Sequence, residues 1–241
     1  MFPLLLSKTR LAAYFLAIIA AVFFAACSSD DSSFTDRDST ADASYKVTFN
    51  STWNSETFPT NFPSGAHFSG LIGATHNEQV KFWEPGQIAS DGIVSMAETG
   101  SRSILTAEIE AQKSEGKAEF LLSGAGNDAS GLVEFEFDIN QEYSLITLVS
   151  MVAPSPDWFV GVRDLSLFDE AENDWKQTMT VSLIVYDAGS DNGLVFEAAN
   201  ADTQPREVIT RLSSAPEDTD FVEGVTEGGE FIGSFTFERI K

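Results

Sequence analysis

The sequence predicts an all-β fold, an antiparallel β-sandwich with one or two short helices in its connections. Several short segments alternate apolar and polar residues with the period of two that a half-buried strand requires. Turn-forming stretches such as GAGNDASG (124–131) and SDNG (190–193) separate these segments. Short strands, many turns and few helices together indicate a sandwich.

The first predicted strand is YKVTFNSTW, residues 45–53. Its apolar side chains, Tyr45, Val47 and Phe49, alternate with polar ones, so one face of this strand is expected to lie against a core. The segment at 131–139 repeats the pattern. Its apolar residues are Val133, Phe135 and Phe137, and its acidic residues, facing the other way, are Glu134, Glu136 and Asp138.

Further strands are predicted at 143–153, 179–189, 206–214 and 233–240. Residues 92–116 predict a helix instead, because apolar residues such as Ile104 and Ile109 recur among charged ones without the alternation of a strand.

The amino end predicts a secretory signal over residues 1–26. Lys8 and Arg10 precede an apolar run that is shorter than the roughly 20 residues needed to cross a bilayer core. Cys27, the only cysteine, follows two alanines, and small residues before a lone cysteine at this place resemble the lipobox of bacterial lipoproteins. We therefore expect cleavage before Cys27 and a lipid on its thiol. Ordinary cleavage that leaves a free thiol is the alternative.

Residues 27–44 are rich in Ser and Asp and are expected to form a flexible tether, because they offer little apolar surface to bury. The remaining residues, 45–241, suit a single domain. Ser28 stands directly after the cysteine, where the sorting rule of enteric lipoproteins directs a chain without Asp to the outer membrane. The expected location is therefore the bacterial outer membrane or the cell surface.

The formal net charge of −23 excludes nucleic acid as a partner, because binding phosphate requires a basic surface. An acidic surface also repels anionic lipid unless divalent cations bridge the two. The domain holds no cysteine for a disulfide, so apolar burial and metal ions are the expected sources of its stability.

The domain contains, in this order, the stretches YKVTFNSTWN, FWEPGQIASDGIVSMAETG, SMVAPSPDWFVGV and WKQTMTVSLIVYDAGSDNG. Together they resemble the spondin amino-terminal domain family of F-spondin-like and mindin-like proteins. The most specific part is APSPDWFVG followed later by YDAGSDNG. The resemblance implies a β-sandwich similar to C2 domains, a role in adhesion outside the cell as in animal members, and one divalent cation, expected to be calcium, at one edge of the sandwich.

The resemblance maps the ligands of this cation onto Asp138, Asp157 and Asp187. Calcium takes six to eight oxygen ligands, so loops from one end of the sandwich have to converge on it. Asp157 follows a strand that leaves through Pro154 and Pro156, whose fixed φ angles hold the direction of the turn. At Asp138 mindin-like sequences carry the longer glutamate. Asp157 and Asp187 can instead be plain turn residues.

Asp191 is either a further ligand or a turn residue. Trp158 and Phe159 are expected in the core, holding Asp157 from behind, and an exposed binding edge is the alternative for this pair. His67 and His76 are expected to pack or to form hydrogen bonds, because zinc would need further nitrogen or sulfur ligands.

The expected function is that of a non-catalytic, calcium-binding spondin-domain lipoprotein of the cell envelope, acting in adhesion or surface binding. Its expected partners are the membrane, through the lipid anchor, and an extracellular protein or glycan. One alternative is an envelope-associated hydrolase using Ser155, Asp157 and His67, although no G-x-S-x-G elbow surrounds the serine. The other is a calcium-dependent phospholipid-binding module, which rests on analogy of fold alone.

Overall fold

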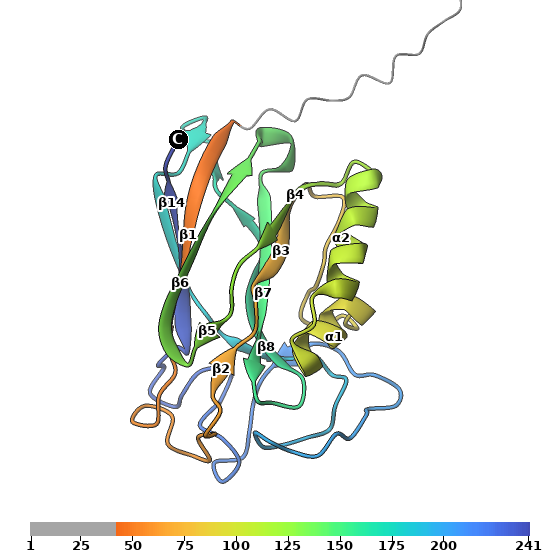
Figure 1. The fold of residues 1–241 in the computed structure, drawn as a ribbon, viewed down its shortest axis with the longest axis vertical. Helices are drawn as coiled ribbons and strands as arrows, with labels where there is room; N and C mark the ends of the chain where they lie inside the picture. The colour runs from red at the N-terminus through yellow and green to blue at the C-terminus, as the bar shows by residue number, and fades with distance from the viewer. Residues whose placement is uncertain (1–41) are drawn as a thin grey trace, which may run out of the picture. The chain divides into compact units, whose positions relative to one another are not determined.

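The computed structural model describes residues 42–241 (Figure 1). The predicted signal, Cys27 and the predicted tether up to residue 41 lie outside the described residues. Ala43 and Ser44, which the sequence assigns to the tether, belong to the first strand. Within residues 42–241, no helix is long and apolar enough to cross a membrane.

The described chain contains fourteen strands, two α-helices and one 3-10 helix. The strands are β1 (Ala43–Thr52), β2 (His67–Phe68), β3 (Ile72–His76), β4 (Ala118–Ser123), β5 (Asn127–Asp128), β6 (Ser130–Ile139), β7 (Leu145–Ala153), β8 (Trp158–Ser166), β9 (Phe168–Asp169), β10 (Asp174–Trp175), β11 (Thr178–Ser182), β12 (Val185–Asp187), β13 (Thr210–Arg211) and β14 (Gly233–Arg239). The helices are α1 (Asp91–Thr99), α2 (Ser103–Ser114) and η1 (Gln141–Tyr143).

Two antiparallel sheets form the predicted sandwich. The first sheet has four strands in the order β11-β14-β1-β6. The second has the order β13-β12-β8-β7, and β7 then pairs with β3 along its first half and with β2 near its end. A separate pair, β9 and β10, makes a small hairpin between β8 and β11. The all-β sandwich with short helices is therefore confirmed.

Aromatic side chains fill the space between the two sheets. Tyr45, Val47 and Phe49 of β1 are fully buried, as their alternation predicts. The Phe49 ring meets those of Phe68 and Phe235 edge to face, with centroids 4.9 and 5.0 Å apart. Because each such ring removes a large apolar area from water, this cluster stabilises the sandwich.

The helices α1 and α2 lie against the outer face of the second sheet, beside β3, β4 and β7 and away from β1 and β6 (Figure 1). A second hydrophobic cluster fills this layer, and it includes Ile93 and Met96 of α1, Ile109 of α2 and Phe159 of β8. The second sheet is thus covered on both faces. This explains why almost every residue of β7 is buried.

The sequence predicts one helical stretch at 92–116, and the structure divides it at Gly100. This glycine has φ 68°, and its N–H donates to the Met96 carbonyl at 2.9 Å, closing α1 in a left-handed cap. A Cβ built on Gly100 would lie 3.0 Å from the Cβ of Ser69. The backbone and the packing therefore both favour glycine here.

Gly100→Ala is expected to lower the free energy of unfolding by roughly 1 to 2 kcal/mol, because alanine disfavours the left-handed conformation. Urea unfolding of the two proteins measures this loss. Gly65→Ala is the matched control, since Gly65 has open space around its Cβ position and no left-handed φ. Equal losses in the two variants would contradict this assignment of the Gly100 cap.

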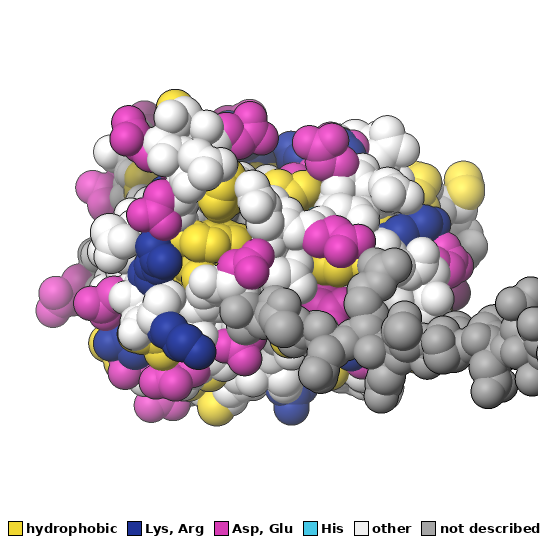
Figure 2. Space-filling model, turned by 90° about the horizontal axis from the view of Figure 1, so that it is seen from above, with side chains coloured by type: hydrophobic (Ala, Val, Ile, Leu, Met, Phe, Trp, Pro, Cys, Tyr) yellow, Lys and Arg dark blue, Asp and Glu magenta, His cyan; other side chains and the backbone are white. Residues whose placement is uncertain are grey.

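Acidic side chains are spread over the face seen from above, and Lys and Arg side chains form no continuous patch there (Figure 2). This view agrees with the net charge of −23 of the whole chain. On this face the described residues therefore offer no basic surface for nucleic-acid phosphates.

Candidate cation site

The turn from β7 to β8 carries Asp157, and its neighbours fix it firmly. The hydroxyl of Ser155 accepts a hydrogen bond from the Trp158 N–H at 3.1 Å. Trp158, 1 % exposed, points into the core between the sheets, and Phe159, fully buried, points into the helix layer. Successive residues of a strand face opposite sides of the sheet, so Trp158 and Phe159 anchor the start of β8 in the hydrophobic layers on both of its faces. The prediction that both rings lie in the core is confirmed.

Asp157 is fully buried, and its two carboxylate oxygens have different surroundings. Oδ2 accepts hydrogen bonds from the Ser190 N–H at 2.7 Å, the Ser190 hydroxyl at 3.1 Å and the Asp191 N–H at 3.1 Å. Oδ1 is buried and has no hydrogen-bond partner among the described residues. Burial raises the pKa of Asp157 above its usual value, against the opposing effect of the donors from Ser190 and Asp191.

Asp187 ends β12, directly beside the start of β8. It pairs with Trp158 in the strand register, and its Oδ1 accepts a hydrogen bond from the Gly189 N–H at 2.8 Å. Gly189 has φ 73°, and any Cβ on it would strike the Glu207 carbonyl, so glycine is required at this bend. Burial, and after it the negative charge of Asp157, raises the pKa of Asp187 to about 7.

Asp191 has a turn role in this loop. Its two carboxylate oxygens accept hydrogen bonds from the Gly193 N–H at 2.7 Å and the Ala201 N–H at 2.8 Å. Both oxygens are therefore engaged in holding the loop that follows β12.

Asp138 does not join this group, so the prediction that all three aspartates converge is wrong. It is an exposed residue of β6, paired with Ser44 of β1 and hydrogen-bonded by the Ser44 hydroxyl at 2.6 Å. The other end of β6, at Ser130, is the end near β7, because Asp128 pairs with His67 and His67 with Ala153. At about 3.3 Å per residue, Asp138 lies about 26 Å from Ser130 along the strand.

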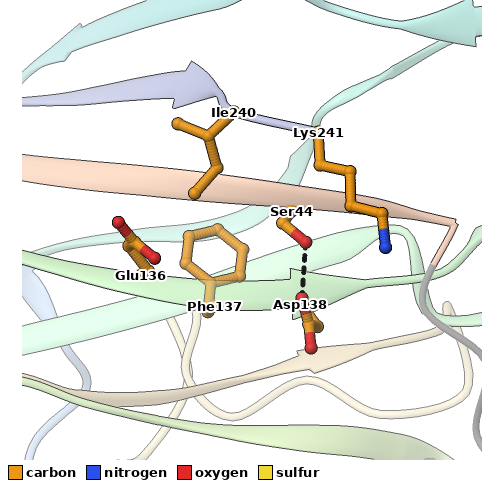
Figure 3. A pocket seen from close by; sticks show the side chains of 6 residues that line it. All are labelled: Ser44, Glu136, Phe137, Asp138, Ile240 and Lys241. Atoms are coloured by element: carbon orange, nitrogen blue, oxygen red, sulfur yellow. Dashed lines mark hydrogen bonds between the residues drawn. The ribbon is translucent and has the colours of Figure 1, made fainter.

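Figure 3 shows where Asp138 is instead: with Glu136 and Lys241 it lines an open hollow of about 340 Å³. The physical reason is the alternation of β6, which turns every acidic residue of the strand to the outer face of the first sheet. No group of three or more His, Cys, Asp or Glu side chains within residues 42–241 could hold a metal ion by itself. The structure thus brings together Asp157 and Asp187, and not Asp138.

Ser190 makes a contact that the sequence does not predict. It supplies two of the three donors to Asp157 and ties the loop after β12 to the turn before β8. A serine in a turn has many uses, so its place in SDNG alone does not indicate this partner.

The residues of the hydrolase alternative are otherwise engaged. The Ser155 hydroxyl belongs to its own turn, and the carboxylate of Asp157 binds Ser190 and Asp191. His67 is exposed, and its Nδ1 contacts the Gly65 carbonyl at 2.7 Å. His76 is buried and bonded to Thr147 and Asn77, as expected of a packing histidine. These hydrogen bonds do not join serine, histidine and aspartate into a relay.

Residues 43–222 match the Spondin_N family. Human Spondin-2 is 33 % identical over 178 residues, which cover 72 % of this chain and 53 % of that protein. Rat Spondin-2 is 31 % identical over a stretch of the same length, and rat Spondin-1 is 34 % identical over 179 residues, or 22 % of its own length. The match spans about half of the Spondin-2 proteins and less of Spondin-1. With three quarters of its length matched in this way, the chain belongs to the Spondin_N family.

Proposed function

We propose that this protein is a non-catalytic binding protein of a bacterial cell envelope, exported and anchored by a lipid on Cys27, whose domain holds one calcium ion between Asp157 and Asp187. It acts in adhesion or surface binding, with an extracellular protein or glycan as its ligand. The amino-terminal sequence is the basis for proposing the lipid anchor and the envelope location. The surroundings of Asp157 and Asp187 are the basis for proposing the cation.

One observation carries the cation: the Oδ1 of buried Asp157 has no partner among the described residues, and the charge of Asp157 acts on the nearby Asp187. A buried carboxylate oxygen without a donor is costly, and two neighbouring negative charges add to that cost. A divalent cation between them offsets both effects. Carboxylate oxygens are also the ligands that calcium prefers. The residues present therefore fit this ion.

Two aspartates supply only part of the six to eight oxygens that calcium takes. The remainder would come from main-chain carbonyls, water or an acidic group of a ligand. A cation held in this way can bridge the domain to its partner as well as hold its loops together.

The position of the site suits such a bridge. The described residues begin at Asp42. Its main-chain N–H donates a hydrogen bond to the Ile139 carbonyl, at the end of β6 that carries Asp138. Asp157 and Asp187 lie toward the opposite end of the sandwich, as the strand registers show. A domain tethered through Asp42 thus presents the candidate site away from its point of attachment.

The two alternatives from the sequence have less support. A hydrolase needs Ser155 and His67 in one relay, and both are bonded elsewhere. Calcium-dependent docking on phospholipid still rests on the sandwich fold alone.

Thermal unfolding with and without calcium tests the proposal. At a calcium concentration about a hundredfold above Kd, binding adds about 2.7 kcal/mol, which for a domain of this size raises Tm by roughly 5 to 10 °C. Asp138→Asn is the matched control and is expected to keep the full shift, because Asp138 lies at the other end of β6. A wild-type Tm that calcium leaves unchanged, or a shift lost in Asp138→Asn, contradicts this cation site.

A further inference from the structure

β11 is the outermost strand of the first sheet on the side opposite β6. Its only partner among the described strands is β14, so its other edge is unpaired. The Leu183 N–H donates to the Gly233 carbonyl, and the Gln177 carbonyl accepts from the Arg239 N–H, both at 2.9 Å. Odd-numbered residues therefore direct their main-chain groups toward β14. Because main-chain direction alternates along a strand, the N–H and C=O groups of Thr178, Thr180 and Ser182 face outward.

Within residues 42–241, this edge shows no charge, proline or bulge of the kind that usually prevents pairing with another chain. Natural edge strands are protected by charges, prolines, bulges or covering segments. β11 has the sequence TMTVS, without charge or proline, and its register with β14 is unbroken. The other edge of the same sheet, β6, carries three exposed acidic residues, Glu134, Glu136 and Asp138. One edge of the sheet is thus protected and the other is open.

A cleft of about 350 Å³ adjoins the open edge. It lies between β11 and the part of β8 after Val160, where β12 no longer pairs with β8. Val181 and Ser182 line it on one side and Gly161 and Val162 on the other, together with Ile184 of the crossing segment and Tyr186 of β12. The cleft offers apolar and aromatic side chains next to a row of outward main-chain groups, and the charged side chains of Arg163 and Asp164 also line it.

We propose that β11 is a docking edge for an extended segment of another protein, which adds as a fifth strand to the first sheet. Main-chain hydrogen bonds to Thr178, Thr180 and Ser182 would hold the segment, and every second side chain, apolar, would enter the cleft beside Val181 and Ile184. The net charge of −23 repels a second copy of this chain and favours a neutral or basic segment. This inference does not depend on the cation site.

Selection and amide exchange test the docking edge. A phage-displayed library of random peptides of about twelve residues, long enough for one strand, is selected on the immobilised full chain. We expect the enriched peptides to alternate apolar residues and to carry no net negative charge. A synthetic copy of one such peptide is expected to slow hydrogen exchange at the amides of Thr178, Thr180 and Ser182 by about tenfold or more.

Two variants of Thr180 distinguish the contribution of its main-chain N–H to peptide binding from that of its side chain. Thr180→Pro removes the outward N–H together with the Thr180 hydroxyl and is expected to weaken peptide binding about tenfold. Thr180→Val keeps that N–H and loses the same hydroxyl contact to Thr236, so its binding is expected to stay within about twofold of wild type. If Thr180→Pro does not fold, the exchange pattern of the wild type decides.

Four results would overturn the proposal. The first is a selection without enriched peptides, the second is protection of other amides, and the third is equal binding by Thr180→Pro and wild type. The fourth is self-association of the chain, seen by sedimentation, that protects the β11 amides without peptide, since the occupant would then be a second copy.

Discussion

Asp187→Asn is expected to stabilise the calcium-free protein at about pH 8 by roughly 1 to 3 kcal/mol. The pKa of Asp187 is raised to about 7, first by burial and then by the charge of Asp157, so above that pH the native fold carries a charge that its surroundings disfavour. Asparagine keeps the oxygen that accepts from the Gly189 N–H and removes the charge. The expected gain in stability is smaller than the energy that corresponds to the full pKa shift, because the side chain is partly exposed.

The pH dependence of this gain has a definite sign. Native Asp187 keeps its proton up to about pH 7, whereas the unfolded chain loses it near pH 4. Between these values the unfolded state binds fewer protons, so the wild type loses stability relative to Asp187→Asn as pH rises. Above about pH 7 the difference is expected to level off. Urea unfolding of both proteins in chelator across this range measures the difference, and a gain that does not change with pH would contradict the buried charge of Asp187 as its cause.

Calcium is expected to reverse the order of the two proteins. The wild type gains the binding energy of the ion, and Asp187→Asn has lost one of the two charged ligands. A variant that is more stable than wild type in chelator and less stable in calcium is difficult to explain by a general packing effect. Asp187→Asn retaining the full calcium shift would argue against Asp187 as a ligand.

The strands that the sequence predicts best are those with one face in the core. β1, β6 and β14 alternate clearly, and each lies within a residue or two of its predicted range. β8 was not predicted: Trp158, Phe159 and Val160 are buried in succession, so its start lacks the alternation of a half-buried strand. Its bend at Asp164, with φ 47°, further hides the pattern.

The sequence also does not show where the chain changes sheets. Residues 179–189 are predicted as one strand, yet β11 pairs with β14 in the first sheet and β12 with β8 in the second. The crossing at Leu183 and Ile184 contains no glycine, proline, asparagine or aspartate that would mark a turn in the sequence. The strand predicted at 206–214 is much shorter in the structure, where β13 has two residues. The N–H groups of Glu207 and Ile209 donate to the loop residues Gly189 and Gln87 rather than to a strand.

The candidate site was half predictable. Asp157 and Asp187 adjoin strands that pair with each other, and the charge of Asp157 acts on the carboxyl group of Asp187. Asp138 was placed by resemblance, although the alternation of 131–139 already turns it to the face opposite Phe137 and toward solvent. Alternation was therefore a better guide to that residue than the position of the family's glutamate.

Asp157→Ala is expected to lower the free energy of unfolding by roughly 2 to 4 kcal/mol in the absence of calcium. The carboxylate is the acceptor for the N–H groups of Ser190 and Asp191, and both residues are buried. Alanine leaves these donors without a partner, and their lost hydrogen bonds outweigh the relief of removing a buried charge. The loop after β12, including Asp187, is expected to loosen with them.

Asp157→Asn distinguishes the effect of the hydrogen bonds from Ser190 and Asp191 from the effect of the negative charge of Asp157. Its amide oxygen can still accept from Ser190 and Asp191, so its stability in chelator is expected to lie close to that of the wild type or above it, while its response to calcium is lost. Urea unfolding in chelator and thermal unfolding with calcium measure the two effects. If Asp157→Asn were as unstable as Asp157→Ala, the charge of Asp157 would itself be holding the loop, and the cost attributed to its burial would be wrong.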